Sequence, residues 1–166
     1  HGESKAYKQR VHYLHGALHL FDAGRRLQKY TWINTGTPII EQVRDALTRN
    51  EFPLFVSEAN SEQKLKKIQH SAYLHHAYKS YVGVLRAGKS SALMVLGHSL
   101  DQTDDHIFER IAKSQLAELY VSLHGDVLEP NNVEIVRRAE RLKAKRTEDF
   151  PLHIGYFDAA SAAPWG

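Results

Sequence analysis

A continuous apolar run, Ala92–Leu96, constrains the fold of this chain more than any other stretch. It reads ALMVL between Gly88 and Gly97, and continuity instead of alternation predicts a strand covered on both faces, as in parallel sheets. Polar residues follow directly, and apolar residues at helical spacing begin at Ile107. The stretch therefore predicts a strand, a turn at Gly97 and a helix.

The same alternation of strands and helices extends over most of the chain. It predicts the order β-α-β-α-β-α-β from Pro53 onward, which is typical of a parallel sheet with helices on its faces. The first of these helices is expected to be long and uninterrupted, from Glu62 to about Arg86. The predicted strands cover residues 53–56, 92–96, 119–123 and 152–157.

The residues before Pro53 predict a different local pattern. Val11–Gly16 favours a further strand that ends at His15-Gly16. Two apolar runs within residues 17–32 flank Asp22-Ala23-Gly24 and predict a β-hairpin. Thr37 followed by Pro38 indicates the start of a helix that ends near Asn50.

Length and composition limit the classes of protein to consider. The 166 residues fit one α/β domain, 1–166, with a sizeable core. The absence of cysteine excludes disulfides and thiolate metal sites and favours a reducing compartment, so we expect the cytoplasm. The chain has 22 basic and 19 acidic residues, and this small excess of positive charge does not indicate nucleic-acid binding. No apolar run is long enough to span a membrane.

Candidate site residues follow the predicted strands. Ligands of open parallel sheets bind beyond the carboxyl ends of the strands, and polar residues or glycines stand at each of these ends. The alternative is that strand ends are ordinarily polar and rich in turns. The candidates are His15, Gly97, His98, Ser99, Asp101, His124 and Asp158.

The turn at Gly97 has the most specific pattern. Glycine lets the backbone approach a ligand, Ser99 and backbone N–H groups can bind phosphate at the start of a helix, and Asp101 can bind a ribose hydroxyl. The alternative is helix capping, which we favour for Thr103, Asp104 and Asp105.

Histidines and a basic segment offer weaker signals. His15, before Gly16, could be a general base or an ordinary surface histidine. His12, His15 and His19 do not predict a metal site, because alternate residues of a strand point to opposite faces. The basic segment 137–146 favours a solvated helix face over an anion site.

Several multi-residue motifs together resemble a bacterial family of uncharacterised proteins with sirtuin-like features, and the resemblance covers nearly the whole chain. The sirtuin-like relation rests mainly on Leu14-His15-Gly16 and Gly97-His98-Ser99-Leu100. The other motifs are Tyr13–Phe21, Lys29–Trp32, His70–Leu74, Asp104–Ile107 and Phe157–Ala162.

The resemblance implies a Rossmann-like, three-layer fold that binds NAD or a related nucleotide. It assigns His15 to the catalytic histidine of the Leu-His-Gly motif, and Gly97 and Ser99 to the turn that contacts the dinucleotide. His124 and Asp158 fall where sirtuin-like proteins border the adenosine. Because the zinc-binding cysteines of sirtuin deacylases are absent, the resemblance argues against deacylation and for NAD hydrolysis, as in sirtuin-like proteins of bacterial defence.

The same resemblance predicts that this chain is the C-terminal portion of a larger domain. The glycine-rich nucleotide loop and the Asn-Tyr-Asp segment expected of an N-terminal half are not in the sequence. We therefore expect the missing half and a second copy of the chain as candidate partners, and no turnover by the 166 residues alone. The alternative function is a non-catalytic sensor of NAD or ADP-ribose, or an interaction module.

Overall fold

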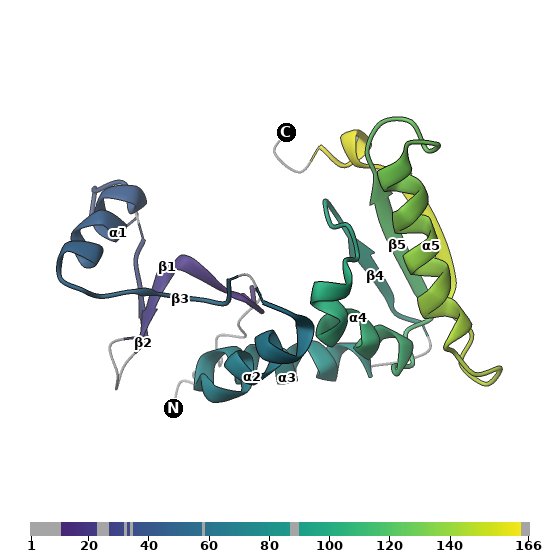
Figure 1. Ribbon diagram of the computed structural model, residues 1–166, viewed down its shortest axis with the longest axis horizontal. Coiled ribbons are helices and arrows are strands. Elements are labelled where there is room, and N and C mark those ends of the chain that lie inside the picture. Colours follow the sequence, from purple (N-terminus) through teal and green to yellow (C-terminus); the bar gives the residue numbers. More distant parts are fainter. Residues whose placement is uncertain are drawn as a thin grey trace, which may run out of the picture. The chain divides into compact units, whose positions relative to one another are not determined.

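The computed structural model describes residues 11–22, 27–31, 33, 35–57, 59–86 and 90–163 (Figure 1). These fall into two compact units, His1–Glu58 with Lys66–Lys79 and Ala59–Leu65 with Ser80–Gly166. Gly24 and Gly88, to which the sequence assigns turns, lie outside the described residues. Each unit is built on its own three-stranded sheet.

The first unit contains an antiparallel sheet of order β2-β1-β3. The predicted hairpin is present, because β1 (Gly16–Asp22) pairs antiparallel with β2 (Leu27–Lys29). The helix α1 (Ile39–Thr48) packs against β1, and buried Phe21, Val43 and Ala46 form the core between them. Pro38, not Thr37, is the N-cap of this helix.

The predicted strand over residues 11–16 is wrong. Leu14 and His15 form a turn, closed by a hydrogen bond of 3.1 Å from the Gly16 N–H to the Tyr13 carbonyl. Gly16 has a φ of +76°, which favours a turn at this point, and β1 begins there. His15 therefore precedes a strand instead of following one.

The strand β3 (Pro53–Phe55) also departs from the prediction. It pairs antiparallel with β1 and is not a member of the parallel sheet. Its neighbour Val56 donates its N–H to the His15 carbonyl at 2.8 Å, which extends the contact beyond the strand. The parallel sheet consequently starts one strand later than the alternation predicts.

The long helix predicted from Glu62 to Arg86 is divided in two. The helix α2 (Ser61–His70) ends before Ser71, and α3 (Ala72–Leu85) begins after it. The Ser71 hydroxyl accepts the N–H of Leu74 at 3.4 Å, as a serine does at the N-cap of a new helix. A single capping serine thus interrupts an otherwise continuous helical pattern.

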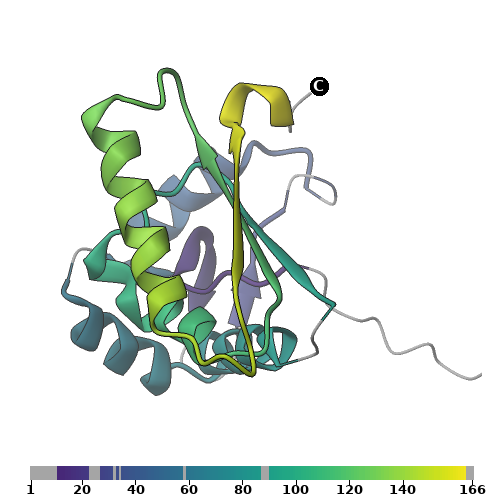
Figure 2. The ribbon, with the colours of Figure 1, turned by 90° about the vertical axis from the view of Figure 1, so that its right-hand side faces the viewer.

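The second unit confirms the mixed α/β prediction. The strands β4 (Ala92–Val95), β5 (Glu118–Leu123) and β6 (His153–Asp158) form a parallel sheet in that order. The short 3₁₀ turn η1 (Gln102–Asp104) and the helix α4 (Asp105–Ala112) connect β4 to β5. Helix α5 (Pro130–Ala144) connects β5 to β6 and lies along one face of the sheet (Figure 2).

The two faces of this sheet differ in burial. Leu119 and Val121 are fully buried on the face that α5 covers. On the opposite face, Met94 of β4 is 66% exposed, and Ala92 is exposed as well. The expectation that β4 is covered on both faces is therefore wrong for the side that carries Met94. No helix among the described residues is long and apolar enough to cross a membrane.

Candidate functional site

The three parallel strands of the second unit end at one edge of the sheet. Their register pairs Val95 with Val121, and Leu123 with Asp158. The loops that follow therefore start side by side, as the carboxyl ends of parallel strands do. Six of the seven predicted site residues belong to this edge, namely Gly97, His98, Ser99, Asp101, His124 and Asp158.

Gly97 makes the turn that the sequence assigns to it. Its φ is +67°, a conformation that favours glycine, and open space surrounds the position of a Cβ. Its N–H donates to the Oγ of buried Ser122 at 2.9 Å. This N–H is therefore already satisfied within the sheet and is not free to bind a phosphate.

The two ring nitrogens of His98 are both engaged. Nδ1 accepts the N–H of Leu100 at 2.9 Å, so the hydrogen of the neutral ring is on Nε2. Nε2 lies 3.3 Å from a carboxylate oxygen of Asp104, to which it donates. The ring also packs edge-on against Phe108, with 4.9 Å between centroids. His98 therefore holds the turn in place and is not a free base.

Asp104 is the charged centre of this turn. It accepts a hydrogen bond of 2.7 Å from the Nζ of Lys64, and only 14% and 11% of the two side chains are exposed. Lys64 and Ser61 stand on the first turns of α2, and the Ser61 hydroxyl accepts the N–H of His106 at 2.7 Å. The start of α4 is thus bound to the start of α2.

Asp101 caps the 3₁₀ turn η1, and Asp104 stands at the N-cap position of α4 that we assigned to it. The Asp101 carboxylate accepts the N–H of Thr103 at 3.0 Å, whereas Asp104 makes no side-chain cap to α4. Arg138 pairs with the other carboxylate oxygen of Asp101 at 3.0 Å. The hydrogen bond from Thr103, and then the Arg138 guanidinium, hold the pKa of Asp101 below its ordinary value.

Arg138 attaches the turn to α5. Its guanidinium donates to the carbonyl of Ser99 at 3.0 Å and to Glu134 at 2.8 Å, in addition to Asp101. The Ser99 hydroxyl is exposed and has no hydrogen-bond partner in the described part of the chain. The turn therefore has a fixed backbone and presents one free hydroxyl.

The buried side chain of Asn132 holds the loop after β5 through hydrogen bonds to its backbone. This residue is 4% exposed, and its amide donates to the carbonyls of His124 and Asp126 at 2.8 and 2.7 Å. Gly125 between them has a φ of +74°. The His124 side chain is exposed and makes no hydrogen bond or ion pair with other described residues. Asp158, the last residue of β6, accepts the N–H of Ala160 at 3.0 Å.

His15, the seventh candidate, belongs to the first unit and is half-buried in the turn before β1. His12, His15 and His19 do not alternate along one strand as expected, because of the three only His19 is in a strand. Burial, and then the charge of Lys29, lower the pKa of His19.

Three residues that hold this region together were not predicted as site residues. Lys64 lies on a polar helix turn, and Arg138 and Arg146 belong to the basic segment 137–146. Arg146 is half-buried and donates to the carbonyls of Ile111 and Leu116. Only the spacing of Glu134 and Arg138, four residues apart, is a local signal of an ordered guanidinium.

The second unit is therefore an α/β unit whose parallel strands end in ordered loops. The family described as "Domain of unknown function (DUF4917)" matches residues 2–165, and the chain belongs to this family. This agrees with the uncharacterised family expected from the sequence. Neither the curated proteins nor the solved structures gave a match to the chain.

Proposed function

We propose that the protein binds NAD or a related nucleotide at the carboxyl edge of the β4-β5-β6 sheet. The observation that carries this proposal is the ordered pair of loops at this edge, each with a glycine at positive φ, Gly97 and Gly125. Loops of this kind let a ligand approach the backbone closely. They also present the unpartnered side chains of Ser99 and His124.

Several backbone N–H groups at this edge already donate hydrogen bonds within the protein, so fewer groups could bind a phosphate. The N–H groups of Gly97, Thr103 and His106 already donate to protein oxygens. The start of α4 is therefore not an open anion site. We assign phosphate binding to the Ser99 hydroxyl and to the backbone around His98.

The other candidates would bind the sugar and the base. Asp101 keeps a carboxylate at the turn that can accept a ribose hydroxyl, with its charge maintained by Arg138. His124 follows β5 and Asp158 ends β6, and both would border the adenosine. We propose with it that the unit with the parallel sheet has a Rossmann-like fold related to that of sirtuins.

For a catalytic function, His15 is the proposed base. It would take the proton of a water molecule that adds to C1′ of the ribose as the bond to nicotinamide breaks. We further propose that a glycine-rich segment outside this sequence completes the site, so that the 166 residues alone do not turn over NAD.

A second function, binding of NAD or ADP-ribose without hydrolysis, is favoured by His98. It is the imidazole of the Gly97–Asp101 turn, and both of its nitrogens are engaged with Leu100 and Asp104. This turn consequently offers a binding surface without a free imidazole base.

Calorimetric titration with NAD and ADP-ribose, together with chromatography for released nicotinamide, separates the two functions. Ser99→Ala should weaken binding about 10-fold, the effect of one hydrogen bond to a charged group. The control is Thr147→Ala, which removes an exposed hydroxyl before β6, at the opposite edge of the sheet. Equal affinity of the two variants would contradict the proposed site.

If the protein completed by its partner segment releases nicotinamide, His15→Ala should abolish release and leave binding intact. Binding without release in the completed protein would support the sensor function. Release by His15→Ala at the normal rate would overturn the role of His15.

A further inference from the structure

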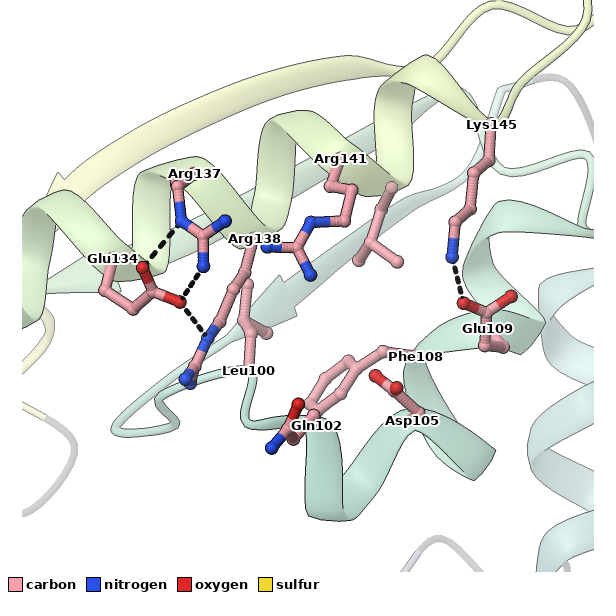
Figure 3. A pocket seen from close by; sticks show the side chains of 11 residues that line it. Leu100, Gln102, Asp105, Phe108, Glu109, Glu134, Arg137, Arg138, Arg141 and Lys145 are labelled. Atoms are coloured by element: carbon pink, nitrogen blue, oxygen red, sulfur yellow. Dashed lines mark hydrogen bonds and ion pairs between the residues drawn. The ribbon is translucent and has the colours of Figure 1, made fainter. Parts of the chain in front are cut away.

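A groove separates α4 from α5 (Figure 3). It is open to solvent, and its enclosed part has a volume of about 80 Å³. Three apolar side chains form its floor, Leu100, Phe108 and Leu142, and they are 3%, 5% and 6% exposed. The groove thus combines an apolar floor with charged walls.

The two walls carry opposite charges at regular helical spacing. Arg137 and Arg141 of α5 stand four residues apart and line the groove, and Lys145, the C-cap of this helix, continues the row. On α4, Asp105 and Glu109 form the facing row. Side chains four residues apart share a helix face, so each helix presents one row of one sign.

Most of these charges are neutralised within the protein. Lys145 pairs with Glu109 across the groove, and Glu134 binds both Arg137 and Arg138 (Figure 3). These pairs involve five of the charged residues that line the groove. Two further charged lining residues are not part of them.

Among the charged residues that line the groove, Arg141 and Asp105 have no hydrogen bond or ion pair with another described residue. Both line the groove, one on each wall, and both extend into the space between the helices (Figure 3). An unpaired guanidinium favours a carboxylate, and an unpaired carboxylate favours an ammonium group. A ligand with only one of these charges would satisfy one wall and leave the other unpaired.

We propose that this groove binds a small zwitterion, an α-amino acid with an apolar side chain. Its carboxylate would pair with Arg141 and its ammonium group with Asp105. Its side chain would lie against Leu100, Phe108 and Leu142. This site shares no assigned ligand contact with the proposed nucleotide site, so either can fail without the other.

Titration calorimetry with three matched probes tests the proposal. L-leucine carries both charges, isocaproate lacks the ammonium group, and isoamylamine lacks the carboxylate. Leucine should bind saturably, and each of the other probes should bind about 10-fold more weakly because it loses one charge-assisted contact.

Variants identify the groove as the place of binding. Arg141→Met and Asp105→Asn should each weaken leucine binding about 10-fold. Lys143→Met is the control, because Lys143 stands on the same helix, pairs with Glu140 and does not line the groove. All three positions are exposed, so none of the changes alters the core.

Three results would overturn the proposal. The first is no saturable binding of leucine at millimolar concentration. The second is isocaproate binding as tightly as leucine, which would make Asp105 irrelevant. The third is unchanged leucine affinity in Arg141→Met.

Discussion

The two sheets of this protein each depend on a glycine, but the neighbours of the two glycines differ. A Cβ at Gly16 of the antiparallel sheet would lie 1.9 Å from the carbonyl oxygen of Leu54. A Cβ at Gly155 of the parallel sheet would lie 2.6 Å from the ring of Tyr120. Backbone cannot move aside without breaking strand pairing, whereas a side chain can turn. The first sheet therefore tolerates less change at its glycine than the second.

Gly16→Ala should have the largest effect. Positive φ and the contact with Leu54 act together, and we expect a loss of about 3 kcal/mol or more of unfolding free energy in urea. Gly36→Ala is the matched control, because Gly36 has a φ of +65° and open space around it. It should cost only about 1 kcal/mol. Equal losses for the two variants would show that the Leu54 contact is relieved.

Lys64→Met should come second and tests the polar turn beside the parallel sheet. It removes the ammonium partner of the half-buried Asp104 carboxylate, and we expect a loss of about 2 kcal/mol. Lys67→Met, an exposed change on the same helix, is the control in urea unfolding. If both variants lose the same amount, the Lys64–Asp104 pair contributes nothing specific to stability.

Gly155→Ala should cost less, about 1–2 kcal/mol, because the Tyr120 ring has to turn. Tyr120→Leu combined with Gly155→Ala should recover most of this loss in a double-mutant cycle of unfolding free energies. Such a rescue distinguishes a side-chain obstacle from the backbone obstacle at Gly16. Strictly additive effects would contradict the comparison.

The smallest effect concerns Glu134 beside the groove. Hydrogen bonds from Arg137, and then from Arg138, lower the pKa of its carboxyl to about 2 from an ordinary 4.5. A lowered pKa in the folded state stabilises the protein above pH 4.5 and loses this effect as pH falls toward 2. Because the group is exposed, the change in stability should be slight.

Carbon NMR of the Glu134 carboxyl checks this prediction directly. Its titration midpoint should lie near 2 in the wild type and move toward 4.5 in Arg137→Gln. A wild-type midpoint already near 4.5 would show that the arginines do not hold this carboxylate in solution.

The parallel half of the fold was predictable from sequence, whereas in the antiparallel half the β1-β2 hairpin and α1 were predicted but the pairing of β3 with β1 was not. Continuous apolar runs separated by helical periodicity located all three strands of the parallel sheet within about one residue. The pairing of β3 with β1 depends on contacts between Gly16 and residues near Leu54, which no local pattern specifies. A short strand indicates its own extent but not its partner.

At the candidate site, sequence located the turn but not the roles within it. Asp101 and Asp104 are both spaced to cap the following helix. Lys64, distant in sequence, pairs with Asp104, which makes no side-chain cap to α4, and Asp101 caps the 3₁₀ turn η1. Arg138 was likewise read as part of a solvated basic face, although it binds the turn. These roles depend on tertiary contacts that residue spacing does not encode.

The most direct test of the proposed nucleotide site is amide NMR of the protein titrated with NAD. We expect saturable shift changes at the amides of residues 97–101, 124–126 and 158. We expect smaller changes at the amino edge of the sheet, near Ser91 and Leu152. No shift changes, or changes confined to residues away from the carboxyl edge, would contradict it.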